Sequence, residues 1–495
     1  MNKKNTISLI LLVAMLASLA ACGTSEVSQD TGDTSAAVVD TTASNADIPE
    51  EINRENAKLR LPEIDFGGET FNLLYVGEDV YRQDIYAEET GDVVDDAVFA
   101  RNRAIEELLN CKLNPICFSD DTKTTANHIG TVVKAQEDLY DLCSTHQAYT
   151  AMLVTNGYFH NFADDTYIDW EMPWWNTEYM NEMVVGNDTI FFLLGDISLM
   201  RMKSLGSVYY NREMYEELYG DADGMYDIVF DGKWTFDRFA KMCTDAYIDL
   251  NGNTVSDEGD RFGAFGNKTK SVEHYQYACG ITSTTKNADG IPELTLNNEK
   301  TVDYVNKFYS LYYENPGFRI DTDGTFNRQI GDFKSGYYLF CPVWFRHADS
   351  LREMETDYGI VNFPKYAEDE EYRALVHDGT TLFVTPVTSK KTDKIGAVCE
   401  AMGYYNYISV TPAYFEVALK VKYSRDDKTS KVLDIISESA YTNFGYVYAT
   451  QIANLGYLRS LASEGTNDFS SWYAKMEPSG QKGLQKLIDT YLAME

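Results

Sequence analysis

Basic side chains are scarce in this sequence. Its 495 residues include 42 Lys and Arg against 77 Asp and Glu, which gives a formal net charge of −35 at pH 7. A protein that binds nucleic acid neutralises phosphates with an excess of cations, so this balance argues strongly against a nucleic-acid partner. Adsorption to an anionic membrane surface is disfavoured for the same reason.

Catalytic and metal-binding signatures are missing as well. The six histidines show no HExxH or other recognisable ligand spacing, and the eight cysteines include no CxxC pair. The chain has no G-x-S-x-G elbow, no P-loop and no G-x-G-x-x-G. With 77 acids, no single carboxylate pair points to a glycosidase. We therefore predict that the protein is not an enzyme, and the sequence does not choose disulfide partners.

Long apolar runs are confined to the N-terminus. Lys3 and Lys4 precede an apolar stretch from Ile7 to Leu19, which is typical of an export signal. Small residues before Cys22 resemble the bacterial lipobox, with a plain secretory signal as the alternative. No later stretch reaches the ~18 apolar residues of a spanning helix. We predict a signal peptide over residues 1–21 and a lipid-modified Cys22 that holds the protein at the outer face of the cytoplasmic membrane, in a Gram-positive cell.

The segment after Cys22 lacks everything needed for a core. Residues 23–53 contain seven acidic residues and neither Lys, Arg nor an aromatic residue. Such a composition cannot bury enough apolar surface to fold. It predicts a flexible acidic stalk, which we place over residues 22–65.

The rest of the chain alternates between strand and helix patterns. We expect a helix opened by Asp95 and Asp96, another capped by Thr235, and a C-terminal helix whose apolar face includes Leu484, Leu487, Ile488, Tyr491 and Leu492. The expected strands are Thr70–Val76, Cys111–Ile116, Tyr140–Cys143, Ile190–Leu194, Ser207–Tyr210, Gly336–Cys341, Tyr358–Phe363 and Thr381–Thr385. This alternation predicts an α/β fold with largely parallel sheets.

One loop has the spacing of a calcium site. Counted from Asp249, oxygen side chains fall at the first, third, fifth, ninth and twelfth positions, as in an EF-hand loop. Thr254 stands where that loop has glycine, and the last position is the shorter Asp. A polar surface loop with an Asn-Gly turn is the alternative. If a structural Ca²⁺ is bound, the expected ligands are Asp249, Asn251, Asn253, Val255 through its carbonyl, Asp257 and Asp260.

Several segments resemble family 1 solute-binding proteins of bacterial carbohydrate ABC importers. The similarity lies in residues 232–237 with the loop that follows them, in residues 333–344, in residues 358–365, and in a block of residues 400–426. The resemblance covers roughly residues 66–495. It implies a two-lobed α/β fold of the periplasmic-binding-protein type, with the ligand cleft between the lobes. On this pattern residues 66–206 form the first lobe, residues 207–379 the second, and residues 380–495 a helical region that packs on both.

Ligands in such folds lie beyond the carboxyl ends of strands. Trp344 follows a strand at the position that resembles a sugar-stacking Trp, and we expect it to dominate binding while contributing little to the core. The other candidate ligand contacts are His146, Gln147, Tyr209, Asp378, Trp174, Trp175, Glu78 and Asp79. Trp174 and Trp175 are alternatively loop braces, and Tyr209 and Asp378 are alternatively hinge residues without a ligand.

The predicted function is capture of a carbohydrate, expected to be an oligosaccharide, for delivery to ABC permease subunits. Sugar rings offer C–H patches to aromatic faces and hydroxyls to polar side chains, which suits a chain with 36 tyrosines. We expect a monomer that touches the membrane only through its lipid anchor. The alternatives are a peptide or polyamine ligand, a surface glycoside hydrolase, and a surface adhesion module.

Overall fold

The first β-sheet contains strands from distant parts of the chain. In the computed structural model, which describes residues 52–186, 189–321, 326–351, 354–419 and 427–494, β1 (Glu69–Tyr75) lies between β2 (Cys111–Cys117) and β3 (Leu142–His146) and is parallel to both. β12 (Thr381–Val384) pairs antiparallel with β3 at the edge. The sheet is therefore mostly parallel, as the sequence predicts.

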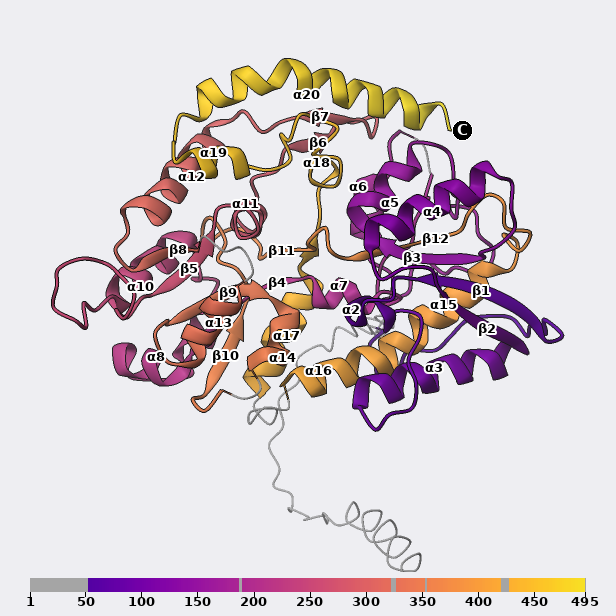
Figure 1. The fold of residues 1–495 in the computed structure, drawn as a ribbon, viewed down its shortest axis with the longest axis horizontal. Helices are drawn as coiled ribbons and strands as arrows, with labels where there is room; N and C mark the ends of the chain where they lie inside the picture. Colours follow the sequence, from indigo (N-terminus) through magenta and orange to yellow (C-terminus); the bar gives the residue numbers. More distant parts are fainter. Residues whose placement is uncertain (1–51, 187–188, 322–325, 352–353, 420–426, 495) are drawn as a thin grey trace, which may run out of the picture. The chain divides into compact units, whose positions relative to one another are not determined.

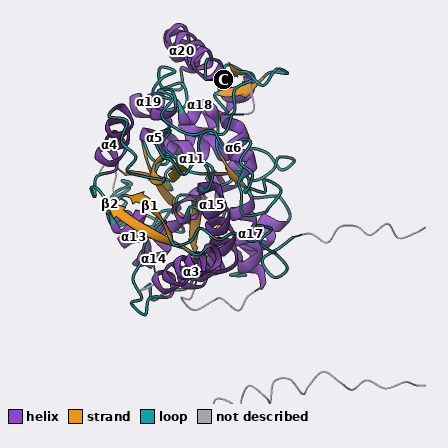
Figure 2. Ribbon diagram, turned by 90° about the vertical axis from the view of Figure 1, so that its right-hand side faces the viewer, coloured by secondary structure: helices purple, strands orange, loops and turns teal. Residues whose placement is uncertain are grey.

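Helices cover this sheet because their apolar faces need burial. In α3 (Val93–Leu109), the Asp92 carboxylate accepts hydrogen bonds from the Val94 and Asp95 amides, while Val98 and Ile105 are fully buried. Asp92 is the cap, and the predicted Asp95 and Asp96 occupy the first turn. The other helices of this part are α2 (Asp79–Arg82), α4 (Thr122–Lys134), α5 (Gln147–Val154), α6 (Thr177–Met183) and α7 (Leu199–Lys203) (Figures 1 and 2).

The second sheet is mixed, and its central strand is antiparallel to both neighbours. β4 (Gly206–Asn211) lies between β9 (Phe340–Trp344) and β10 (Tyr358–Val361). The Phe340 amide donates to the Gly263 carbonyl at 2.7 Å, which joins β9 to the segment that leads into β5 (Ala264–Asn267). β5 in turn pairs in parallel with β8 (Phe318–Asp321).

Seven helices of the described chain accompany this sheet. They are α8 (Arg212–Tyr219), α9 (Gly224–Phe230), α10 (Phe236–Ala246), α11 (Val272–Ala278), α12 (Glu299–Tyr309), α13 (Asn327–Lys334) and α14 (Ala348–Leu351). The predicted cap of α10 is confirmed, since the Thr235 hydroxyl accepts from the Arg238 amide. Trp234 beside it is fully buried, and its indole N–H donates to the Asn362 carbonyl at 2.8 Å.

The C-terminal helices contact helices that accompany each of the two sheets. They are α15 (Ile395–Tyr405), α16 (Thr411–Leu419), α17 (Asp427–Glu438), α18 (Phe444–Val447), α19 (Arg459–Glu464) and α20 (Phe469–Leu492). α16 packs against α3 and α14, whereas α20 packs against α12 and, through Tyr491, against Phe191 (Figure 1). Four short strands complete the fold: β6 (Thr284–Lys286) with β7 (Pro292–Leu294), and β11 (Ala374–Leu375) with β13 (Ala440–Tyr441).

Two predicted strands differ from the structure. The strand expected from Gly336 begins only at Phe340, because Gly336 has a φ of +81° just past the end of α13 and turns the chain there. Residues 190–194 form a single bridge, Leu193 to Phe383, rather than a strand. The predicted strands at residues 70–76, 111–116 and 358–363 are confirmed as β1, β2 and β10 with shifted ends.

The folded unit starts earlier than expected. It begins at Ile52, and the last part of the predicted stalk packs on the core through Leu59, Leu61 and Ile64, because these side chains are apolar. The signal peptide, Cys22 and the rest of the stalk lie outside the described residues. The lobe boundaries remain a prediction.

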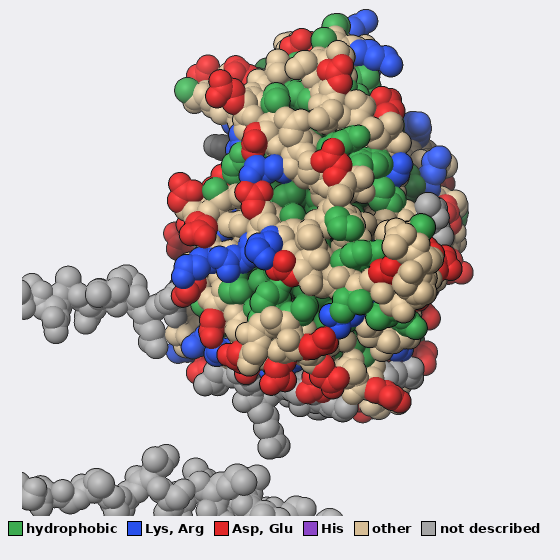
Figure 3. All heavy atoms as spheres, turned by 90° about the vertical axis from the view of Figure 1, so that its left-hand side faces the viewer, with side chains coloured by type: hydrophobic (Ala, Val, Ile, Leu, Met, Phe, Trp, Pro, Cys, Tyr) green, Lys and Arg blue, Asp and Glu red, His purple; other side chains and the backbone are tan. Residues whose placement is uncertain are grey.

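Two further observations concern membrane-spanning helices and cysteines in the described part of the chain. Within it, we find no helix with the length and apolarity that crossing a membrane requires. Its seven cysteines are all free, and only Cys117 is exposed. Asp and Glu side chains are scattered over the face shown in Figure 3 rather than gathered in one place, as expected for a solvated acidic surface.

Candidate functional site

The carboxyl end of β3 supplies the first side chain of the candidate site. His146 is the last residue of this strand, and its Nδ1 accepts a hydrogen bond from the Ala148 amide at the start of α5. Its ring lies 6.3 Å from that of Tyr81 and 5.2 Å from that of Tyr149. Burial lowers the pKa of His146, although the charge of Asp378 opposes the shift. His146 is therefore a neutral side chain at neutral pH.

The carboxyl end of β9 supplies the second side chain of the candidate site, Trp344. Trp344 is 6% exposed, and its indole N–H donates to His274 Nε2 at 2.6 Å. Because Nε2 of His274 accepts, the ring proton must sit on Nδ1. Burial, assisted by His377, holds the pKa of His274 well below its ordinary value. Nδ1 is buried without a partner within the described structure.

Close approach of the backbone makes room for this pair. Gly206 on β4 faces Trp344 across the sheet. A Cβ added to Gly206 would lie 2.3 Å from His274 Nδ1, which no side chain tolerates. Glycine at this position lets His274 from α11 reach the strand end.

Cations and histidines surround the Trp344 indole. The His347 ring is stacked against it at 5.5 Å between centroids, and His377 lies 4.6 Å away. The Arg346 guanidinium lies over the indole at 4.3 Å and the Lys270 ammonium at 5.7 Å, both within cation–π range. Burial, with Arg346 and Lys270 nearby, lowers the pKa of His347 to about 3. The indole is thus enclosed rather than open for stacking.

Asp378 enters the cluster from the segment that follows β11. Its backbone amide donates to the Tyr446 hydroxyl at 3.0 Å, and its carboxylate lies 3.1 Å from His377 Nδ1. This contact is not an ion pair, because the same Nδ1 accepts from the Gly379 amide and burial holds the His377 pKa well below its ordinary value. Burial also raises the pKa of Asp378.

Glu78 and Asp79 lie at the rim. Both are exposed, and Asp79 forms an ion pair with Arg82 at 3.2 Å. The charge of Glu78 acts on Tyr81 and on Arg346. The cluster thus combines residues that follow β1 and β3 with residues of β9, of α11 and of the segment after β11.

The four other predicted contacts lie in the core. The Tyr179 hydroxyl donates to Gln147 Oε1, and the Tyr209 hydroxyl donates to the Phe345 carbonyl at 2.8 Å. Trp174 is fully buried, with its ring edge-on to Tyr404 at 5.4 Å, and Trp175 donates its N–H to Glu400 at 2.8 Å. For the tryptophans, this is the arrangement of the loop-brace alternative.

Sequence reasoning overlooked six members of the cluster. They are Tyr81, Lys270, His274, Arg346, His347 and His377. Arg346 and His377 adjoin the predicted Trp344 and Asp378, so widening each candidate by a few residues would have found them. Nothing in the sequence connects Lys270 or His274 to the same site, because only the packing of α11 beside β4 and β9 brings them there.

The Asp249 loop is held together by its own amide groups. The carboxylates accept hydrogen bonds from within the loop: Asp249 from Gly252 and Thr254, Asp257 from Asn251 and Asn253, and Asp260 from Leu250. Across the residues that the structure describes, no group of three His, Cys, Asp or Glu side chains is arranged to hold a metal ion. The side chains as placed do not form a calcium cage, and Ca²⁺ at this loop, including the Val255 carbonyl, remains a prediction.

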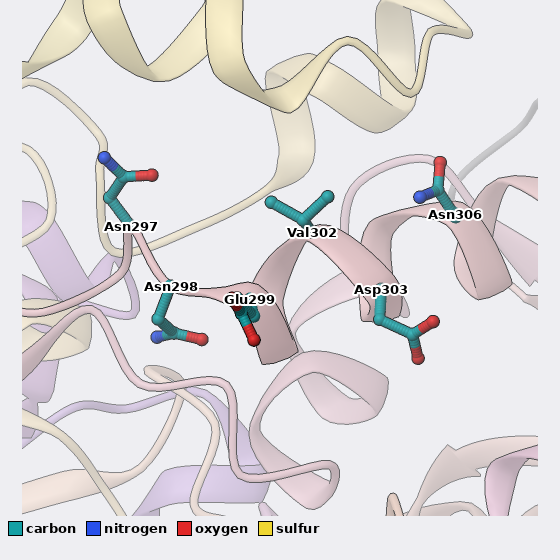
Figure 4. A pocket seen from close by; sticks show the side chains of 6 residues that line it. All are labelled: Asn297, Asn298, Glu299, Val302, Asp303 and Asn306. Carbon is teal, nitrogen blue, oxygen red and sulfur yellow. The ribbon is translucent and has the colours of Figure 1, made fainter.

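A surface hollow beside α12 has a different character. Asn297, Asn298, Glu299, Val302, Asp303 and Asn306 line it (Figure 4). Three of its polar side chains serve the local fold: Asn298 caps α12, Asp303 accepts from the Tyr366 hydroxyl, and Asn306 accepts from Asn467.

The fold of this chain is similar to that of several solved structures. No family model and no curated protein matches the sequence. Among solved structures, UspC from M. tuberculosis has a TM-score of 0.55 at 12% identity, covering 84% of this chain and all of its own. A cyclo/maltodextrin-binding protein complexed with maltotetraose scores 0.54 at 12% identity, covering 86% and 97%. The extracellular solute-binding protein of Staphylococcus aureus in complex with maltose scores 0.52 at 12% identity, covering 86% and 97%. The chain therefore has the two-lobed α/β fold of extracellular solute-binding proteins.

Proposed function

We propose that this protein captures a carbohydrate and delivers it to the permease of an ABC importer. The observation that carries the proposal is the cluster around Trp344, in which strand ends and helices from both sheets converge on aromatic rings, histidines, a carboxylate and two cations. Such a mixture suits a sugar, whose C–H faces pack on rings and whose hydroxyls both donate and accept. Two of the solved structures with a similar fold are complexes with sugars, one with maltotetraose and one with maltose.

The alternatives fit these residues less well. A polyamine needs converging carboxylates, whereas Asp378 shares the cluster with Arg346 and Lys270. A glycosidase needs two carboxyl groups flanking its substrate. Among the described residues that form the cluster, Asp378 is the one carboxyl group, and Glu78 lies at the exposed rim. The maltodextrin-binding protein and the Staphylococcus aureus solute-binding protein with a similar fold are binding proteins, which supports stoichiometric binding without turnover.

A thermal-shift screen against neutral and acidic oligosaccharides tests the function. A ligand that binds only the folded state stabilises it by about 2.7 kcal/mol at a hundredfold excess over Kd, so at least one sugar should raise the midpoint by several degrees. Titration calorimetry of that sugar should give one site per chain. Release of shorter sugars during the titration would identify a hydrolase, and the absence of any shift would contradict carbohydrate capture.

The proposed anchor has a separate test. Cys22→Ala should move the protein from the membrane fraction to the medium without changing its unfolding midpoint, because the folded unit begins only at Ile52. Cys117→Ala, which removes an exposed cysteine of the folded unit, is the matched control and should stay with the membrane. Equal membrane retention of Cys22→Ala and the parent would contradict lipidation.

A further inference from the structure

Arg346 and Lys270 have no anionic partner within the described structure. Neither side chain forms an ion pair or donates a hydrogen bond to any described residue, and the contact that they share is the Trp344 indole. The Arg346 side chain is half-buried, and burial lowers the pKa of its guanidinium. Two cations around one ring, neither paired with a described residue, are unexpected in a chain with 77 acids for 42 basic residues.

Two other buried arginines have acceptors for their guanidinium groups. Arg201 forms an ion pair with Asp196 at 3.5 Å, and Arg101 donates to the Asn406 side chain at 3.0 Å. An arginine offers five N–H donors in a planar fork that fits a carboxylate or phosphate. At Arg346 the fork has no such acceptor among the described residues.

The surrounding groups do not neutralise the two cations. Asp378 acts on Lys270 and Glu78 on Arg346, but only at a distance, and Glu78 is exposed to solvent. Burial keeps His146, His274, His347 and His377 in their neutral forms, so the histidines add no charge. Nε2 of His347 is buried and without a partner in the described part of the chain, which leaves a further polar atom at this site.

We propose that the site takes a carbohydrate that bears an anionic group, with Arg346 and Lys270 as the charge partners of that group. This inference rests on the proposed carbohydrate function and narrows it to one substrate class. A carboxylate, as in a uronic acid, matches the guanidinium fork in a bidentate manner, and a sugar phosphate offers the same chemistry. The neutral histidines and the Tyr81 hydroxyl remain for the sugar hydroxyls.

Matched pairs of sugars test the proposal on the full-length protein. Calorimetric titration would compare oligosaccharides of galacturonate with those of galactose, oligosaccharides of glucuronate with those of glucose, and glucose phosphate with glucose. A hydrogen-bonded charge contact is worth ~1.5–3 kcal/mol, so the acidic member of at least one pair should bind about tenfold to a hundredfold more tightly. The uronate and phosphate arms distinguish the two sources of the anion.

Variants then assign the preference to these side chains. Arg346→Gln and, independently, Lys270→Gln should weaken binding of the acidic sugar about tenfold or more and should weaken binding of its neutral counterpart by a clearly smaller factor, so that the preference for the acidic sugar narrows. Lys268→Gln is the matched control, because Lys268 lies over Tyr313 instead of Trp344. Equal binding of acidic and neutral sugars, or a preference untouched by both variants, overturns the anion site and leaves carbohydrate capture standing. Failure of every sugar to bind overturns both.

Discussion

Trp344→Ala should lose ligand binding and, at the same time, destabilise the folded protein by about 3–5 kcal/mol, the usual cost of deleting a large buried aromatic ring. The ring is 6% exposed and donates its N–H to His274. It also supports the Arg346 guanidinium at 4.3 Å. Removal therefore opens a cavity and frees the side chains that we assign to the ligand. Urea unfolding measures the first effect and calorimetric titration the second.

Trp344→Phe separates these two effects. Phenylalanine fills much of the space but cannot donate to His274, so we expect a smaller cost, with about 1 kcal/mol of it from the lost hydrogen bond. Arg346 retains an aromatic face, and some binding should survive. An alanine variant with the stability of the parent would contradict the packing of this ring. An alanine variant that binds normally would remove Trp344 from the site.

The sequence predicted where strands end better than it predicted which way side chains point. His146, Asp378 and Trp344 follow or end buried strands and come together, because the carboxyl ends of strands in such folds meet near the ligand. Trp344 was expected to be an open stacking surface that contributes little to the core. The structure encloses it instead, since the strand pairing of Trp344 with Gly206 brings His274 against the indole.

Core placement of the other candidates follows from packing that one-dimensional patterns do not encode. Trp174 and Trp175 belong to a loop, and what they pack against is α15, more than two hundred residues later in the chain. Lys270 and His274 are equally invisible to sequence reasoning, because their role depends on how α11 lies beside the second sheet. The cap of α10 was predictable, since capping is decided within four residues.

The free energy of unfolding should depend on pH through Glu400. This carboxyl lies in α15, is 1% exposed, and accepts from the Trp175 indole at 2.8 Å, while its second oxygen has no partner within the described structure. Burial raises its pKa to about 7, although the Trp175 bond opposes the shift. In the unfolded chain the carboxyl titrates near its ordinary value of about 4.3. At a pH between these two pKa values, the folded state therefore retains a proton that the unfolded state has lost.

A raised folded-state pKa stabilises the fold fully below the unfolded value and loses that contribution as the pH rises through the folded value. We expect Glu400 to cost the parent about 3 kcal/mol of stability between pH 4 and pH 8. Glu400→Gln keeps the shape and the acceptor for Trp175 but carries no titrating proton. Its stability relative to the parent should therefore rise by about the same amount over this range.

Urea unfolding at a series of pH values measures this difference directly. The buried histidines of the cluster titrate in both proteins, so their contribution cancels when the two profiles are subtracted. Glu89→Gln, which removes an exposed carboxylate, is the matched control and should give a profile parallel to that of the parent. If the Glu400→Gln and parent profiles are also parallel, Glu400 titrates normally in the folded protein. Trp175 would then lack the buried, protonated partner that fixes its loop against α15.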